Sequence, residues 1–175
     1  MRAFIALEIP PELEDEIAAL ARELKASVKG RLVPRENYHL TLAFLGDAGE
    51  RQLADAMRVL DEATARFGAI ELKPNGLGKF GRAHDATLWL GFEEDPALME
   101  LATFVRDGLE TCGVDFDAKP FVPHLTIARR AALDAGALPA LPFPLPAHTS
   151  ELALFKSTLT RDGAVYDVVY EVELE

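Results

Sequence analysis

The sequence is poor in the features that mark secreted and membrane proteins. Its single cysteine, Cys112, excludes an internal disulfide. The longest apolar runs, such as AFIAL at residues 3–7, are far shorter than the roughly 20 residues that cross a bilayer. The first fifteen residues carry one basic residue, turn acidic and lack a small-residue cleavage site. We therefore expect a cytoplasmic protein without a signal peptide or a membrane segment.

Positive charge is also scarce. The 175 residues include 18 Lys and Arg against 29 Asp and Glu, which gives a formal net charge of −11. This balance argues against a basic face that holds a long nucleic acid, because phosphate contacts need clustered cations. It leaves room for a short anionic ligand, since the field inside one cleft can differ in sign from that of the whole protein.

Strand and helix patterns of ordinary length fill the chain and predict an α+β fold. Helices are expected over 11–27, 49–67 and 95–113, where leucines and other apolar residues recur at helical spacing. Strands are expected over 2–9, 38–46, 86–92, 124–128, 151–160 and 164–174. A strand followed by a glycine-rich loop is expected over 69–85, and a proline-rich connector over 139–146.

The tripeptide His-Leu-Thr occurs twice, at residues 39–41 and 124–126, which are 124 − 39 = 85 positions apart. Sliding the sequence by 85 without a gap also superposes other pairs: Glu8 with Glu93, Pro11 with Pro96, Leu13 with Leu98 and Leu24 with Leu109. This register predicts a duplicated strand–helix–strand unit. We expect a single bilobal domain over 1–175, with repeat halves of about 1–84 and 85–175. Its two pseudo-symmetric lobes would carry mainly antiparallel sheets that line a central cleft.

The repeated motif carries chemistry on one face of each strand. Side chains alternate along a strand, so His39 and Thr41 share a face, as do His124 and Thr126. A pseudo-twofold axis would bring the two polar faces to one cleft. Two imidazoles can then act as acid and base, and two hydroxyls can donate to phosphoryl oxygens. Arg129 would add a phosphate contact, but its odd spacing from His124 requires a bulge or a strand end.

Other roles for the two histidines have less support in the sequence. Zinc usually needs a third ligand, which neither motif supplies nearby, and a Gly-x-Ser-x-Gly elbow for a serine hydrolase is absent. A lone histidine in a strand is more often a core residue, but the duplication with threonine favours a functional pair. His84 and His148 have no such partner and are expected to be solvated or structural. We expect neither a metal nor a cofactor.

The segments around both motifs resemble those of a known family. HLTLAFLG and PHLTIAR resemble the paired His-x-Thr motifs of the 2H phosphoesterase superfamily, within it the RNA 2′,3′-cyclic phosphodiesterases, or LigT-like "2′-5′ RNA ligases". RAFIALEIPPEL, GLGKFGRAHDATLWLG and LFKSTLTRDGAVYDVV are similar to the family's first strand and helix, middle segment and last hairpin. The resemblance covers nearly the whole chain.

The resemblance implies metal-independent hydrolysis of an RNA 2′,3′-cyclic phosphate to a 2′-phosphate, with reverse 2′-5′ ligation as a weaker implication. It makes His39 the general acid toward the 3′ oxygen and His124 the base, although pseudo-symmetry makes the two rings nearly interchangeable. Thr41, Thr126 and Arg129 would hold the phosphate. The expected partner is an RNA 3′ end or a short oligonucleotide, bound by a monomer. A small cyclic nucleotide as substrate and a non-catalytic RNA-end-binding module remain as alternatives.

Overall fold

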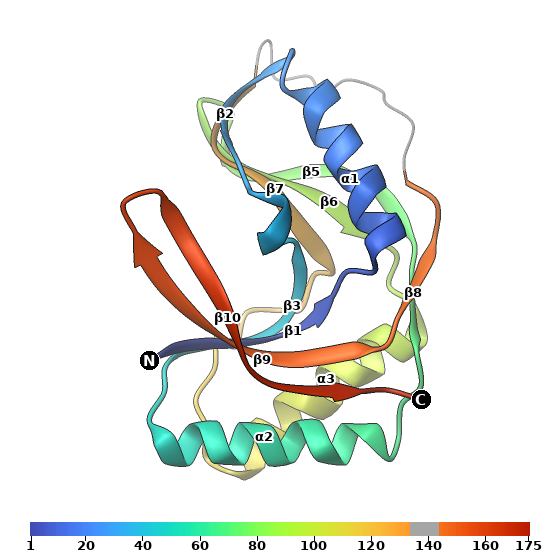
Figure 1. Cartoon of the computed structure of the whole chain (residues 1–175), viewed down its shortest axis with the longest axis vertical. Helices are drawn as coiled ribbons and strands as arrows, with labels where there is room; N and C mark the ends of the chain where they lie inside the picture. Colours follow the sequence, from blue (N-terminus) through green and yellow to red (C-terminus); the bar gives the residue numbers. More distant parts are fainter. Residues whose placement is uncertain (134–143) are drawn as a thin grey trace.

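The computed structural model describes residues 1–133 and 144–175 (Figure 1). Its helices lie where the sequence predicts them: Pro11–Leu24 (α1), Glu50–Thr64 (α2) and Pro96–Thr111 (α3), with a short 3-10 helix, η1, at Arg35–Asn37. The strands are Arg2–Glu8 (β1), Val28–Leu32 (β2), His39–Asp47 (β3), Ile70–Leu72 (β4), Pro74–Arg82 (β5), Asp85–Phe92 (β6), His124–Leu133 (β7), Ala147–Thr149 (β8), Glu151–Thr160 (β9) and Gly163–Glu173 (β10). The connector predicted over 139–146 lies outside the described residues up to 143.

The glycine-rich segment before β6 is a strand, so the loop expected there is wrong. Pro74–Arg82 forms β5 and pairs antiparallel with β6, with Gly78 opposite Trp89. A Cβ atom at position 78 would lie 2.3 Å from the indole ring of Trp89. The glycine therefore makes room for a large ring that lies across the strand, and it does not mark a turn.

Two four-stranded antiparallel sheets form the two lobes of the molecule. The first sheet has the order β10-β9-β1-β3 and the second the order β2-β7-β6-β5. Figure 1 shows the first sheet in the lower part of the molecule, with α2 and α3 beneath it, and the second sheet in the upper part beside α1. A small pair, β4 with β8, lies between the lobes at one side. The expected α+β fold with antiparallel sheets is confirmed.

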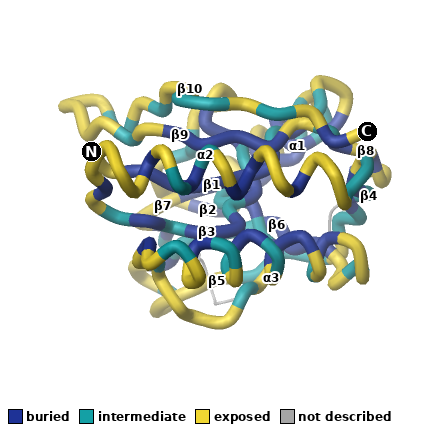
Figure 2. The backbone as a smooth tube through the Cα atoms, turned by 90° about the horizontal axis from the view of Figure 1, so that it is seen from below, coloured by how far each residue is buried: buried dark blue, intermediate teal, exposed yellow. Residues whose placement is uncertain are grey.

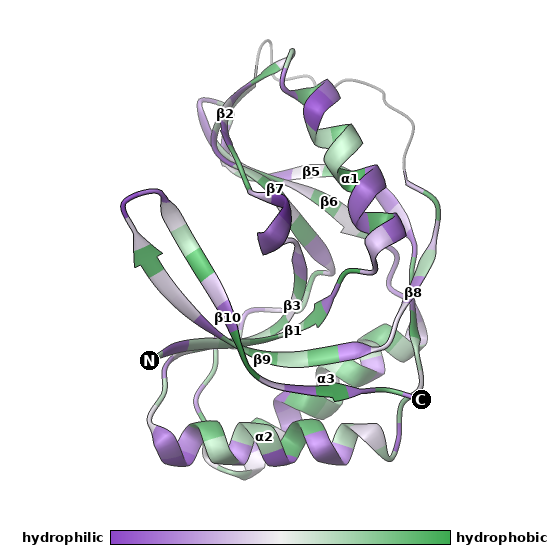
Figure 3. Cartoon of the chain, in the orientation of Figure 1, coloured by the Kyte–Doolittle hydropathy of each residue, from purple (hydrophilic) through white to green (hydrophobic). Residues whose placement is uncertain are grey.

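The helices follow from amphipathic patterns and cover one face of each sheet. Along α1 and α2, hydrophobic positions alternate with hydrophilic ones (Figure 3), and the apolar side of α1 is buried at Leu13, Ile17 and Leu24. The inner strand β1 and much of the edge strand β3 are buried, whereas exposed turns of α2 lie outside (Figure 2). No helix of the described residues is long and apolar enough to cross a membrane.

The lobes do not coincide with the predicted repeat halves. The helix α1 follows β1 of the first lobe but lies with the second sheet, and α3 follows β6 of the second lobe but contacts β3 of the first. Each lobe therefore combines segments from residues 1–84 and from residues 85–175. The duplication stays a prediction. Each lobe is built from segments of both predicted halves.

Strand pairing corrects the gap-free alignment of the halves by two residues. Leu7 pairs with Leu40 in the first sheet, and Leu90 pairs with Leu125 in the second, so these equivalent positions differ by 90 − 7 = 83. The helices still begin 96 − 11 = 85 residues apart. The connection from the paired strand to the helix is therefore two residues longer in the second half. Because the two extra residues lie in a loop, the two His-x-Thr strands keep their offset of 85 from each other. A comparison without gaps therefore does not detect the change.

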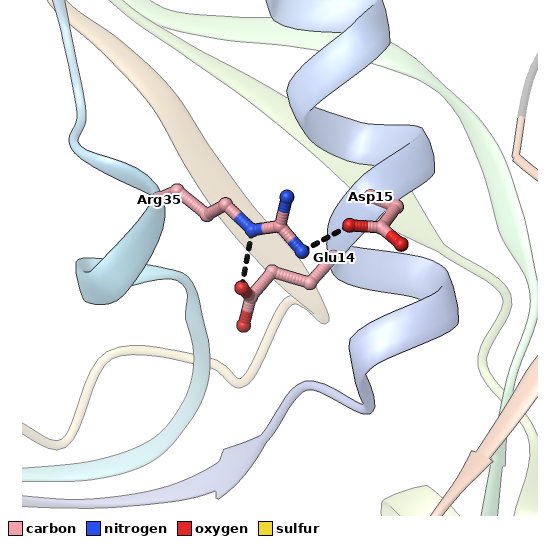
Figure 4. A network of polar contacts seen from close by, with 3 residues as sticks. All are labelled: Glu14, Asp15 and Arg35. Carbon is pink, nitrogen blue, oxygen red and sulfur yellow. Dashed lines mark hydrogen bonds and ion pairs between the residues drawn. The ribbon is translucent and has the colours of Figure 1, made fainter.

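A polar contact outside the core fixes the segment that leads into β3. Arg35 of η1 donates to the carboxylates of Glu14 and Asp15 in α1 (Figure 4). These groups are largely exposed, so the ion pairs add little to stability. Their effect is positional, because η1 ends at Asn37, two residues before His39.

One carboxyl group is held in an unfavourable place for its charge. Glu8, at the end of β1, has carboxylate oxygens close to those of Glu151 and Glu171. Burial, followed by the neighbouring Glu171 and Glu151 carboxyls, raises the pKa of Glu8 from 4.5 to about 8. One oxygen of Glu8 is buried without a hydrogen-bond partner. The folded state therefore favours the protonated form of this side chain.

We predict that the free energy of unfolding falls as pH rises between about 4.5 and 8, because the unfolded chain releases the Glu8 proton earlier than the folded one. Glu8→Gln, which stays neutral, should be more stable than the parent protein at pH 9 and should lose this part of the pH dependence. Urea unfolding at pH 5, 7 and 9 measures the effect. Glu62→Gln, at an exposed position of α2, is the control. An unchanged slope in Glu8→Gln would contradict the prediction.

Candidate active site

A cleft of about 770 Å³ lies between the two sheets and collects the residues that the sequence singled out. His39 and Thr41 of β3 line it from one side, and His124 and Thr126 of β7 from the other. Arg129 lines it as well. The structure thus brings all five predicted site residues together.

Strand alternation explains why these side chains reach the cleft. Leu40 and Leu42, between and beside the polar positions of β3, are fully buried in the core. Leu125 and Ile127 are buried in the same way on β7. Each strand therefore anchors an apolar face against the core and turns its imidazole and hydroxyl to the opposite side.

Both imidazole rings are held by the same backbone hydrogen bond. The Nδ1 atom of His39 lies 2.6 Å from the carbonyl oxygen of Asn37, and the Nδ1 atom of His124 lies 2.6 Å from that of Val122. A carbonyl only accepts, so each Nδ1 carries the proton and donates it. This fixes the tautomer and leaves Nε2 as the atom that can take or give a proton in either ring.

Aromatic side chains surround both rings, which the sequence did not predict. The ring of His39 lies 4.7 Å from that of Phe4 and 5.1 Å, edge-on, from that of Tyr166. The ring of His124 lies 5.2 Å from Phe80 and 5.9 Å from Trp89. These residues come from strands distant in sequence, so only the sheet order brings them together. They restrict the rotation of each imidazole.

The environment of His39 disfavours its charged form. Burial lowers its pKa from 6.5 to about 4, and the hydrogen bond to the Asn37 carbonyl opposes this shift. The charges of Arg129 and His124 lower it further. Because these two residues belong to β7, the second lobe acts electrostatically on the ring of the first. His39 is therefore neutral at pH 7 in the unliganded protein.

A β-bulge supplies the turn that Arg129 needs to reach the cleft. The pairing of β7 shifts register against β2 between Lys29 and Arg31, next to Arg129. It also shifts against β6 at this point, and Arg130 adopts a positive φ of 49°. A non-glycine residue in this conformation is uncommon and typical of bulges beside functional sites. An earlier shift reverses the alternation before Arg129: Thr126 pairs with Trp89 but Ala128 pairs with Leu88, and Ile127 and Ala128 are both buried. This one-residue bulge compensates for the odd spacing from His124.

The segments that precede the two histidines are tied across the cleft. The buried side chain of Asn37 donates to the carbonyl of Ala164 in β10 over 2.9 Å. Arg106 of α3 donates to the carbonyls of Leu42 in β3, at 2.9 Å, and of Lys119, at 2.7 Å. Sequence reasoning missed Asn37 and Arg106, because their partners lie far along the chain. The only signal was a polar residue at an otherwise buried position.

The charge of the cleft is opposite to that of the protein. Its lining contains four cationic side chains and one carboxylate: Arg2, Arg106, Lys119, Arg129 and Asp117. The protein as a whole carries −11. Carboxylates are therefore concentrated elsewhere, and the cleft is the place where an anion meets cationic side chains beside the two imidazoles.

The residues that could form a group of metal ligands lie in a different place. Within residues 1–133 and 144–175, the three carboxyls of Glu8, Glu151 and Glu171 have oxygens within 4.8 Å of one another. None of the three lines the cleft. The two histidines of the cleft have no third histidine, cysteine or carboxylate close enough, among the described residues, to complete such a group.

The chain is similar in sequence to known proteins. The family model of the 2′-5′ RNA ligase superfamily matches residues 9–161. The chain is 31% identical to an RNA 2′,3′-cyclic phosphodiesterase of Thermotoga maritima, over 100% of this chain and 96% of that protein. A second protein of that name, from Thermus thermophilus, is also 31% identical, over 99% and 90% of the two chains.

Solved structures share the fold over nearly the whole length. The crystal structure of Escherichia coli LigT complexed with 3′-AMP superposes with a TM-score of 0.83 at 26% identity, covering 99% of this chain and 97% of that one. TT0787 of Thermus thermophilus superposes with a TM-score of 0.81 at 27% identity, covering 99% and 98%. The extent of the match, together with the paired His-x-Thr strands, leads to one assignment. The chain belongs to the 2′-5′ RNA ligase superfamily, among the LigT-like proteins of 2H phosphoesterase fold.

Proposed function

We propose that this protein is a hydrolase that opens RNA 2′,3′-cyclic phosphate termini to 2′-phosphomonoesters, with His39 and His124 as the acid–base pair. The observation that carries the proposal is the pair of rings anchored through Nδ1 on opposite sides of one cationic cleft. The names of the relatives, RNA 2′,3′-cyclic phosphodiesterase, support the substrate.

The reaction needs two proton transfers at one phosphorus atom. His124 accepts a proton from water at Nε2 as the water oxygen bonds to phosphorus. The bond from phosphorus to the 3′ oxygen breaks, and His39 gives a proton to that oxygen from Nε2. The product is a 2′-phosphate beside a free 3′ hydroxyl. Each positioned proton transfer contributes about 10²- to 10⁴-fold in rate.

The remaining site residues stabilise the charge on the phosphoryl oxygens. The hydroxyls of Thr41 and Thr126 donate to the two non-bridging oxygens, one from each lobe. The guanidinium of Arg129 adds a fork of donors that suits a phosphate. We propose that the reaction is metal-independent, because these side chains supply both the proton transfers and the charge stabilisation.

A 5′ hydroxyl in place of water would run the same chemistry in the direction of 2′-5′ ligation. The description of the matching family, 2′-5′ RNA ligase superfamily, favours this as a second activity. The 2′,3′-cyclic phosphate of a small nucleoside is the alternative substrate, and turnover of mononucleotides compared with oligonucleotides separates the two.

We predict that His39→Ala and His124→Ala each lower kcat at least 100-fold on an oligonucleotide with a 2′,3′-cyclic phosphate end, measured in excess EDTA. The product of the parent protein should be the 2′-phosphate. His148→Ala, at an exposed ring on β8, is the matched control and should keep full activity. Circular dichroism checks the fold of all variants. Full activity of both cleft variants, or loss of the parent activity in EDTA, would contradict the proposal.

The acid role of His39 makes a prediction about its titration. Because its pKa is about 4 in the free protein, the ring can act as an acid near neutral pH only if a bound anion raises that pKa. Sulfate, which stays dianionic over this range, should raise the pKa of His39 in an NMR titration. By linkage, sulfate should bind more tightly as pH falls from 7 to 5.

His39→Gln should weaken this pH dependence of sulfate binding, whereas His84→Gln, at an exposed position, should not. If the pKa of His39 does not change in saturating sulfate, the assignment is reversed: His39 is then the base and His124 the acid.

A further inference from the structure

One aromatic ring in the cleft is exposed without an evident structural reason. Phe80 of β5 is 45% exposed, and it is the aromatic member of the exposed large hydrophobic residues in the part of the chain that the structure describes. It lines the cleft together with both histidines. An exposed phenylalanine beside polar groups contributes little to the core, so its place in the cleft suggests a ligand with an apolar face.

The ring of Phe80 packs edge-to-face with the imidazole of His124, one of the two candidate catalytic residues. It lies 5.2 Å from the ring of His124 at an interplanar angle of 89°, and 5.3 Å from that of Trp89. The indole of Trp89 lies directly against the backbone at Gly78 and Gly91, where a Cβ atom would clash with the ring. This close packing fixes its position. The platform is therefore preorganised by β6 and its neighbours, which lowers the ordering cost of binding.

The chemistry around Phe80 narrows the choice of ligand. The same cleft is also lined by Arg129 and Lys119, which suit a phosphate, and by Thr126, whose hydroxyl can donate a hydrogen bond. A ligand that places a phosphate beside His124 and a flat apolar face beside Phe80 combines an anion with a planar ring. A nucleotide has this combination, and stacking on an aromatic ring is how proteins bind bases with little sequence preference.

We infer that Phe80 is the platform on which the base of the terminal nucleotide stacks, so that binding of the base places the cyclic phosphate beside His124. The inference rests on the proposed function, because it assigns a residue to the base of that substrate. Phe80 takes no part in proton transfer. It determines affinity for nucleosides over base-free sugars and tolerates all four bases.

The test compares two substrates that differ only by the base: adenosine 2′,3′-cyclic phosphate and methyl β-ribofuranoside 2,3-cyclic phosphate. Phe80→Ala should lower kcat/KM for the adenosine compound about 5-fold to 150-fold, mainly through KM, and leave the base-free compound unchanged. Phe80→Leu should behave like Phe80→Ala, and Phe80→Tyr should retain activity. Val168→Ala, half-exposed on β10 and outside the cleft lining, is the control.

The outcomes separate this inference from the proposed function. An equal loss on both substrates in Phe80→Ala would mean that the ring only supports His124, and would overturn the inference while the proposed function stands. If the parent protein hydrolyses neither compound and also leaves an oligonucleotide with a 2′,3′-cyclic phosphate end intact, the proposed function fails. Calorimetric binding of adenosine 2′-monophosphate and ribose 2-phosphate then decides the inference: a preference for the nucleotide that Phe80→Ala removes supports it, and no preference overturns it.

Discussion

The cleft depends on one hydrogen bond that is made twice. In each lobe an imidazole donates from Nδ1 to the carbonyl two residues earlier in the chain, where the strand begins. The bond needs no particular side chain at the accepting residue, which is Asn37 in one lobe and Val122 in the other. It decides the tautomer, and with it which nitrogen is free to react. The aromatic rings around each histidine then limit its remaining rotation.

The distribution of charge complements this arrangement. A surface rich in carboxylates repels a polyanion, and the cationic lining attracts one only where the cleft opens. Long nucleic acids would gain few contacts outside the cleft, because favourable phosphate contacts require clustered cations. An acidic protein can thus act at a nucleic-acid end without holding the rest of the chain, and the net charge and the candidate site are compatible.

Much of this architecture could be predicted from local patterns. Alternation along the strands places His39 with Thr41 and His124 with Thr126, and the structure has these residues in one cleft. The bulge between Thr126 and Arg129 could be required but not located, since it depends on the pairing of β7 with its neighbouring strands. The β5 strand was missed because its glycines serve the packing of Trp89. Arg106 and Asn37 were missed because side chain-to-backbone contacts over long sequence separations leave no periodic signal.

The exchange of helices between the lobes has a mechanical consequence. The chain passes from one lobe to the other after β1, again before β3, and again on both sides of α3. A hinge that spread the sheets would have to bend all of these connections together, and would break the Arg106 bonds to β3 and to the segment before β7. The crossings of the backbone and the Arg106 hydrogen bonds therefore oppose any change in the separation of the two imidazoles.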